Sequence, residues 1–299
     1  MNAFKFLMKF KNLTMKISVI NTGYFKLDGG AMFGVVPKSI WSKTNPPDNN
    51  NMCSWAMRSM LIEIDNQLIL IDTGIGNKQS KKFFSYYHLH GDDSLEQSIN
   101  KAGYSLDEIT DVFFTHLHFD HCGGGVKWLD RDKSILEPVF KNAHYWSNKS
   151  HWDWAIHPNP REKASFLTEN LRPIEESGQL KFISRKEQIT KNIFKGIDVF
   201  FADGHTESQM IPIINYKDQK IVFSADLLPS VGHIPLPYVM GYDTRPLTTL
   251  KEKSEFLSLA QQKNWILYLE HDSVNECCLV TETERGVRLK STHKLAEFL

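Results

Sequence analysis

The chain has 299 residues, and its 35 basic side chains are balanced by 35 acidic ones, with an isoelectric point near 7.2. A protein without net charge offers no field that attracts nucleic acid or an anionic membrane surface, so we expect neither partner and favour a small, weakly charged substrate. No stretch of about 18 consecutive apolar residues occurs, which predicts that no helix spans a membrane.

Residues 1–14 are predicted to form an arm ahead of the first strand. Lys5, Lys9 and Lys11 interrupt its apolar run and no small-residue cleavage site follows, so an export signal is not expected. The four cysteines form no CxxC pair, which favours a reducing, cytoplasmic location. Residues 15–299 contain no linker or repeat and are predicted to form one domain. The hydrophobic arm makes a homodimer a reasonable expectation.

The first third of the chain is rich in strand patterns. Apolar runs at 16–20, 60–65 and 67–72 predict strands, and the turn-prone pair Asp65-Asn66 joins the last two as a hairpin. The segment between residues 20 and 60 is rich in Gly, Pro and Asn, so we expect a long loop there that lines a pocket.

The rest of the chain alternates helix and strand patterns. A capping-box sequence at Ser94 opens a short helix that stops at Gly103, and an apolar strand is predicted at 111–115. Residues 141–180 are rich in aromatic residues and proline, contain a helical stretch at 161–170, and resemble an insertion over a site. Further strands are predicted at 197–203, 220–226 and 264–270, with a helix at 247–262. This order predicts a layered α/β fold.

Metal-ligand residue types gather directly after the strand at 111–115. Six consecutive residues supply His116, His118, Asp120 and His121, and the glycines that follow let the backbone turn sharply. His205, Asp226 and His271 each follow a predicted strand, so their side chains are expected at the same sheet edge. Seven ligands are too many for one tetrahedral ion, whereas two ions about 3.5 to 4 Å apart could share Asp226.

The motifs THLHFDHCGG, ADGHTESQ, SADLLP and LEHD resemble those of the metallo-β-lactamase superfamily, whose fold is an αββα sandwich. Within it, GGAMFGVVPK at 29–38 and the stretch 146–163 resemble the quorum-quenching N-acyl homoserine lactone lactonases. The resemblance implies that one metal is held by His116, His118 and His205, the other by Asp120, His121 and His271, and both by Asp226. Two zinc ions are the default, and cobalt, manganese or iron suit the same ligands.

The same resemblance implies the reaction. A hydroxide that bridges the two metals would open the lactone ring, with Asp120 relaying a proton to the leaving alkoxide. Several lactonases of this family carry a tyrosine three residues after the bridging aspartate, but this chain has Pro229. His233 is expected to donate to the substrate instead, its alternative being an ordinary loop histidine. A broader esterase or phosphotriesterase, or a thioesterase like glyoxalase II, remains open, although only 28 residues follow His271.

Four further features of the sequence need an interpretation. Asp72 either orients the HxHxDH loop or is a plain turn aspartate before Gly74. His88 and His90 are expected in a pocket or subunit contact rather than a metal site, and Cys122 is expected to serve packing. Some aromatic and apolar side chains are expected to form a groove for an acyl chain, drawn from Trp146, Trp152, Trp154, Phe166, Met32 and Phe33.

Overall fold

The computed structural model describes residues 15–130 and 132–299. The expectation that residues 1–14 form an arm lies outside this range. Within the described residues, no helix is long and apolar enough to cross a membrane.

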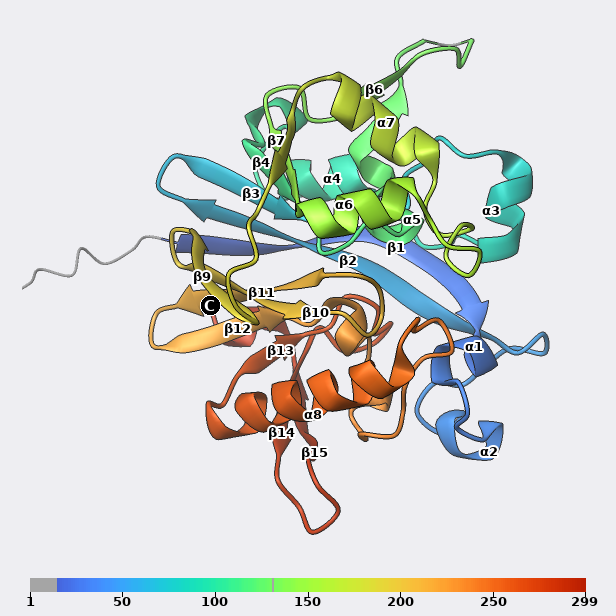
Figure 1. Cartoon of the computed structure of the whole chain (residues 1–299), viewed down its shortest axis with the longest axis vertical. Helices are drawn as coiled ribbons and strands as arrows, with labels where there is room; N and C mark the ends of the chain where they lie inside the picture. The colour runs from blue at the N-terminus through green and yellow to red at the C-terminus, as the bar shows by residue number, and fades with distance from the viewer. Residues whose placement is uncertain (1–14, 131) are drawn as a thin grey trace, which may run out of the picture.

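Two large mixed sheets lie face to face at the centre of the molecule (Figure 1). The first sheet has the strand order β1 (Met15–Asp28), β2 (Met52–Ile64), β3 (Gln67–Ile71), β4 (Asp111–Phe113), β7 (His144–Ser147) and β8 (Leu180–Phe182). The second has the order β15 (Arg288–His293), β14 (Cys277–Thr281), β13 (Ile266–Tyr268), β12 (Gln219–Phe223), β11 (Gln209–Tyr216), β10 (Ile197–Ala202) and β9 (Ile189–Phe194). A separate ribbon pairs β5 (Val126–Trp128) with β6 (Leu136–Pro138).

Helices cover the outer face of each sheet. In Figure 1, α4 (Leu95–Lys101), α6 (Lys149–Ile156) and α7 (Thr168–Glu176) lie over the first sheet, and α8 (Pro246–Gln262) lies under the second. The remaining helices are short: α1 (Gly29–Phe33), α2 (Lys38–Trp41), α3 (Lys81–Tyr87) and α5 (Phe119–Cys122). The layers therefore follow the order helix, sheet, sheet, helix, which confirms the predicted αββα sandwich.

The period-two pattern of β3 shows how the sequence builds these layers. Ile69 and Ile71 join the apolar core between the two sheets, while Leu68 and Leu70 join the core beneath α4, α6 and α7. Because both faces of the strand are covered, its sequence is apolar throughout rather than alternating with polar residues. The hairpin of β2 and β3 forms as predicted, with Asp65 in the left-handed region at a φ of 52°.

The long loop expected between residues 20 and 60 is largely regular structure. β1 continues to Asp28 and β2 begins at Met52, so the two strands pair along most of their length, and α1 and α2 connect them. The prediction of a loop was wrong, because polar residues interrupt the apolar ones in the second half of β1 and at the start of β2 and so hide the strand pattern. The expected place of this segment at a pocket is confirmed, since Leu27 and Met32 line the cavity described below. Trp41 and Trp55, which anchor the connection, are both fully buried.

The helix expected at 161–170 is also displaced. Helical structure occupies α6 and α7 on either side, and residues 160–165 form turns between them. The Asn159 side-chain oxygen accepts the backbone N–H of Arg161 at 2.9 Å, which gives this segment a local alternative to a helix. The helix at 94–103 is confirmed as α4, with the Ser94 side chain accepting the Gln97 N–H. The helix at 247–262 is confirmed as α8.

A buried lysine joins α8 to the segment that precedes Met240. The Lys253 ammonium donates to the carbonyl oxygens of Pro235 at 3.0 Å and Tyr238 at 2.8 Å, and the side chain is 1% exposed. Burial lowers the pKa of Lys253 from 10.5 to about 7. The folded protein thus releases this proton at a much lower pH than the unfolded chain does.

This difference predicts a pH dependence of stability. Above about pH 7 and below 10.5 the unfolded chain binds a proton that the folded chain has lost, so the free energy of unfolding rises with pH. Relative to Lys253→Met, the wild type should gain about 1.4 kcal/mol per pH unit within this window. Urea denaturation of the metal-loaded proteins measures the difference. The exposed Lys251→Met serves as control, and parallel pH profiles for wild type and Lys253→Met would contradict the assignment.

Candidate metal centre

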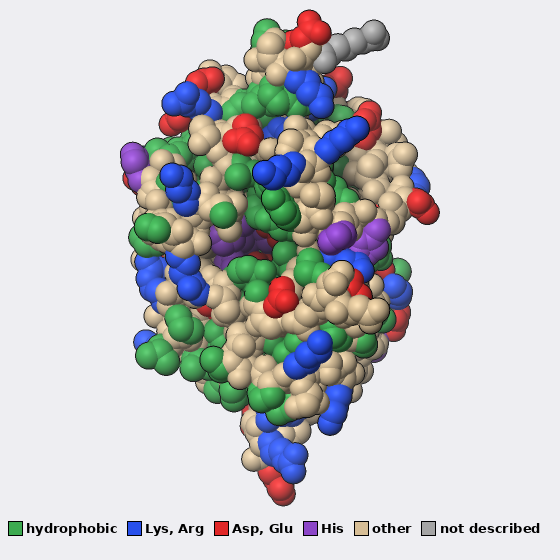
Figure 2. Space-filling model, turned by 90° about the vertical axis from the view of Figure 1, so that its right-hand side faces the viewer, with side chains coloured by type: hydrophobic (Ala, Val, Ile, Leu, Met, Phe, Trp, Pro, Cys, Tyr) green, Lys and Arg blue, Asp and Glu red, His purple; other side chains and the backbone are tan. Residues whose placement is uncertain are grey.

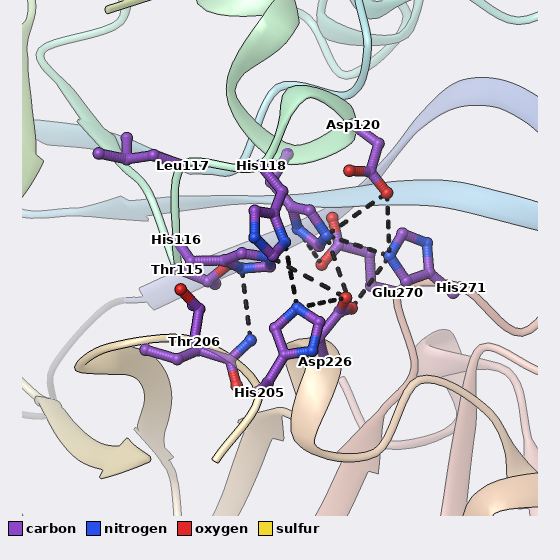
Figure 3. A network of polar contacts seen from close by, with 12 residues as sticks. Thr115, His116, Leu117, His118, Asp120, His205, Thr206, Asp226, Glu270 and His271 are labelled. Atoms are coloured by element: carbon purple, nitrogen blue, oxygen red, sulfur yellow. Dashed lines mark hydrogen bonds and ion pairs between the residues drawn. The ribbon is translucent and has the colours of Figure 1, made fainter. Parts of the chain in front are cut away.

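Four of the predicted ligands lie at equivalent places in the fold. Each stands three residues beyond the last residue of a strand: His116 after β4, His205 after β10, Asp226 after β12 and His271 after β13. β4 belongs to the first sheet and the other three strands to the second. Because the strand ends meet at one edge of the sandwich, the loops that follow them bring their side chains together (Figure 3).

The first ligand group consists of three imidazoles. His118 Nδ1 lies 3.1 Å from His116 Nε2 and 3.1 Å from His205 Nε2. The carboxylate of Asp226 closes this group, with Oδ2 at 3.2 Å from His205 Nε2. These four residues form one of the candidate metal-binding clusters among the described residues.

The second ligand group lies on the other side of Asp226. His121 Nε2 and His271 Nε2 are 3.1 Å apart, and Asp120 Oδ2 is 3.7 Å from each of them. Asp226 Oδ1 approaches this group, at 3.1 Å from His271 Nε2 and 3.5 Å from His121 Nε2. Asp226 therefore presents one carboxylate oxygen to each group, as a bridging ligand does (Figure 3).

The donor chemistry of these groups fits divalent metal ions. Nitrogens that face one another at 3.1 Å need a proton or a cation between them, and an imidazole that lends its lone pair to a metal must be neutral at that nitrogen. Burial and the neighbouring imidazoles lower the pKa of His116 well below its ordinary value. Burial opposes ionisation of Asp226, but His271, His121 and His205 hold its pKa well below the ordinary range. His116 and Asp226 are therefore in their ligand forms. The carboxylates around His121, His205 and His271 outweigh the effect of burial and raise the pKa of these three rings, which would release a proton when a metal ion binds.

The other ring nitrogen of each histidine faces a fixed partner. Such partners orient a ligating imidazole and raise its basicity. They are Glu162 at 3.4 Å from His118, Asp243 at 2.9 Å from His205, Asp72 at 3.0 Å and Glu270 at 3.1 Å from His121, the Ala56 carbonyl at 2.7 Å from His271, and Thr115 Oγ1 at 3.1 Å from His116.

Asp72 is both a turn residue and a side chain that orients the HxHxDH loop, the two interpretations that its sequence allowed. It has a φ of 56°, as a turn residue does, and it is fully buried. Its carboxylate accepts the backbone N–H of Thr115 at 2.8 Å and the Thr115 hydroxyl at 2.6 Å, and it also contacts His121 Nδ1. Asp72 thus joins the start of the HxHxDH loop to one of its ligands.

Three acidic residues of the site were missed by the sequence reading. Glu162, Asp243 and Glu270 come from separate segments, and only Glu270 stands beside a predicted ligand. Burial raises the pKa of Glu270 to about 8, and Asp72 adds to this effect. Burial would also raise the pKa of Glu162, but the nearby His118 ring and a hydrogen bond from the Thr206 hydroxyl lower it to about 2. The signal for Glu162 was its place in the stretch 146–163, whereas Asp243 carried none.

A cavity of about 320 Å³ opens over the two ligand groups. Figure 2 shows histidine and acidic side chains at the bottom of this hollow, with hydrophobic side chains around it. The cavity has an apolar wall and a polar floor. Its lining comprises Leu27, Met32, Tyr87, His118, Phe119, Asp120, Arg161, Glu162, Ala164, Ser165, His205, Asp226, Met240, Gly241, Tyr242 and His271.

Most of the aromatic side chains expected in an acyl groove do not line this cavity. Of the six side chains named for that groove, Met32 alone is part of the lining. Trp152 is 2% exposed in the core beneath the helices, and Trp146 packs its ring against Phe194 at 5.3 Å. Phe166 lies behind the site, with its ring 4.8 Å from that of His118. These aromatic rings pack in the protein interior, and they are therefore not available to line the cavity.

His233 does not reach the cavity. Its side chain is 1% exposed, its Nε2 lies 2.8 Å from the Met32 carbonyl oxygen and its Nδ1 2.8 Å from Ser230 Oγ. The ring stacks on Phe33 at 4.4 Å between centroids. This geometry corrects the expectation that His233 donates to the substrate, because both of its ring nitrogens are already engaged.

The remaining candidates lie away from the ligand groups. His90 Nε2 contacts Ser54 Oγ at 2.7 Å, and its ring stacks on Tyr24. Neither His88 nor His90 belongs to a candidate metal cluster among the described residues. Cys122 is fully buried and donates to the Leu117 carbonyl at 3.2 Å, and burial raises the pKa of its thiol to about 12. Cys122 therefore serves the packing of the loop.

A layered sandwich that carries two histidine and carboxylate groups at one edge defines a metal-dependent hydrolase. The sequence model of the metallo-β-lactamase superfamily matches residues 58–271. The chain belongs to the metallo-β-lactamase superfamily, as that match covers more than half of it. No curated protein matches the chain in sequence.

Solved structures share the fold over nearly the whole chain. A probable metal-dependent hydrolase from Staphylococcus aureus is 26% identical, with a TM-score of 0.81 over 94% of this chain and 98% of that one. AidC, a dizinc quorum-quenching lactonase solved with the product N-hexanoyl-L-homoserine, is 20% identical, with a TM-score of 0.74 over 94% and 95%. The hydrolase AbOPH is 17% identical at the same TM-score and the same coverage.

The partner of His205 provides a test of the first ligand group. Asp243→Asn keeps the shape of the side chain but removes the charge beside His205 Nδ1. Because such partners tune a metal ligand, we expect the metal affinity of the first group to fall about 10- to 100-fold while the second group keeps its ion. Chelator competition, followed as metal ions released per chain, measures this effect.

Asp198→Asn is the matched control, since Asp198 is a buried carboxylate that accepts the Asn192 backbone N–H on the β9–β10 hairpin. Equal loss of both ions from Asp243→Asn, or the same loss from the control variant, would contradict the separate role of the first group.

Proposed function

We propose that the protein is a dinuclear metal-dependent hydrolase that opens the lactone ring of N-acyl homoserine lactones. The observation that carries the proposal is the Asp226 carboxylate, which turns one oxygen toward each ligand group. Two zinc ions are the proposed cofactors, and cobalt, manganese or iron suit the same nitrogen and carboxylate donors. The fold similarity to AidC, which was solved with a ring-opened acyl homoserine product, supports the choice of substrate.

When bound, the metal ions would polarise the ester carbonyl and make a water molecule acidic enough to attack it near neutral pH. The protein supplies the proton transfer. Asp120 turns Oδ2 toward the second ligand group and lines the cavity. Within the described residues its carboxylate takes part in no hydrogen bond, so Oδ1 is available to a substrate. We assign to Asp120 the relay of a proton from the attacking water to the alkoxide that leaves when the ring opens.

The shape of the cavity supports a small acyl substrate. Leu27, Met32, Phe119 and Met240 form an apolar wall next to the ligand groups. A volume of about 320 Å³ suits a small molecule rather than a polymer. The apolar wall would bind the acyl chain while the ester group lies over the ligands.

A parallel comparison of substrates tests this proposal. Metal-loaded protein is offered N-hexanoyl homoserine lactone, a thioester and a phosphotriester, and kcat/KM is measured for each. We expect the lactone to be the preferred substrate, and we expect chelation to abolish its hydrolysis. A preference for the thioester or the phosphotriester would contradict the lactonase assignment and leave the metal-dependent hydrolase in place.

Asp120→Asn extends the same assay to the proton transfer. With metal content held equal to that of the wild type, kcat on the lactone should fall about 100-fold or more, as expected when a general acid is lost. Near-normal turnover by this variant with both ions retained would remove Asp120 from the proposed mechanism.

A further inference from the structure

Two tyrosine hydroxyls in the cavity have no partner in the described part of the chain. Tyr87 is the last residue of α3, Tyr242 follows Met240 in a loop, and both line the cavity. By contrast, the hydroxyls of the buried Tyr145 and Tyr268 donate to backbone carbonyls at 3.0 and 2.9 Å. Half-buried hydroxyls without a protein partner are available to a ligand.

The Tyr87 ring is held against the metal loop. Its centroid lies 4.8 Å from the ring of Phe119, the residue before Asp120, and 4.9 Å from the ring of Phe83. Phe119 is itself anchored, because its backbone N–H donates to the Ser165 carbonyl at 3.0 Å. Tyr87 therefore stays beside Asp120 through aromatic contacts.

The backbone on both sides of Tyr242 is fixed as well. Gly241 N–H donates to the Ala31 carbonyl at 2.8 Å, and the Arg161 guanidinium donates to the carbonyls of Gly241 and Asp243. The Asp243 side chain is engaged with His205. Tyr242 thus stands on a segment that is connected to the first ligand group, with its side chain 37% exposed at the cavity.

The electrostatic surroundings keep both phenols protonated. Burial raises the pKa of Tyr87 to about 12, and the negative charge of Asp120 contributes. Burial also raises the pKa of Tyr242 above its ordinary value, and the neighbouring Tyr87 and Asp120 add to the effect. Both phenols therefore stay protonated near neutral pH, where their hydroxyls are hydrogen-bond donors.

An ester substrate needs such donors. Its oxygens accept hydrogen bonds only, and the carboxylates of the cavity floor are acceptors too. Among the donors of the lining, Arg161 is committed to two backbone carbonyls. The uncommitted hydroxyls of the described lining belong to Tyr87, Tyr242 and Ser165. A phenol carries its hydroxyl farther from the backbone than a serine does, and the Tyr87 ring packs against Phe119, the residue before Asp120.

We propose that Tyr87 and Tyr242 are substrate-binding residues whose hydroxyls donate hydrogen bonds to the reacting ester group beside Asp120. The carbonyl oxygen gains negative charge in the transition state, so these donors stabilise that state more than the bound substrate. The inference rests on the proposed function for the identity of the ester. The two hydroxyls could equally donate hydrogen bonds to the oxygen of a thioester or of a phosphoryl group.

Hydroxyl deletion tests the proposal. Tyr87→Phe and Tyr242→Phe are compared with Tyr86→Phe, which removes an exposed hydroxyl next in sequence to Tyr87, and with Ser165→Ala. Metal content per chain is measured for every variant. On the substrate that the wild type hydrolyses best, each cavity variant should lower kcat/KM at least about 10-fold, mainly through kcat, with two ions retained. Tyr86→Phe should match the wild type, and Ser165→Ala, which removes the third free hydroxyl of the lining, should lose less activity than either cavity phenylalanine variant.

A second substrate identifies the oxygen that is bound. γ-Decalactone lacks the acyl amide, so donors to the reacting carbonyl predict the same fold-loss on it as on N-hexanoyl homoserine lactone. Losses confined to the amide substrate, a loss in Ser165→Ala instead, or unchanged kcat/KM in both phenylalanine variants would overturn the proposal. If the wild type prefers a thioester or phosphotriester, the proposed function fails, while the phenylalanine variants still decide the role of the phenols on that substrate.

Discussion

The site depends on one carboxylate, that of Asp226, held between two sets of imidazoles. It is 8% exposed, and burying an ionised carboxylate is costly unless cations or donors surround it. Its oxygens lie 3.2 Å from His205 Nε2 and 3.1 Å from His271 Nε2. A pair of metal ions would stabilise the buried carboxylate and the facing imidazole nitrogens, because each ion would bind one oxygen of Asp226 and the nitrogens around it.

The sandwich makes this arrangement through the ends of its strands. His116, His205, Asp226 and His271 each follow a strand by the same interval, and the strands come from both sheets. The core between the sheets fixes the strands and hence the start of each loop. Carboxylates and backbone carbonyls then fix the rings, so that the fold orients the ligand atoms.

The gathering of the seven proposed ligands at one edge could be predicted from the sequence, because they form a contiguous motif or follow an apolar run. The partners of those ligands could not, since Glu162 and Asp243 lie in loops whose course depends on tertiary packing. The substrate-binding role predicted for His233 was wrong for a related reason. His233 lies close to Asp226 in sequence, but its ring is buried, with Nε2 beside the Met32 carbonyl and its face stacked on Phe33. The start of β2 was missed because its pairing with β1 spans a connection of two short helices.

The metal pair can be tested most directly by crystallography of the metal-loaded protein, with anomalous scattering at the absorption edge of the bound metal. The account predicts two peaks about 3.5 to 4 Å apart, one among His116, His118 and His205 and one among Asp120, His121 and His271, with Asp226 between them. A single peak, or a peak placed instead within the cluster of Asp72, His121 and Glu270, would contradict it.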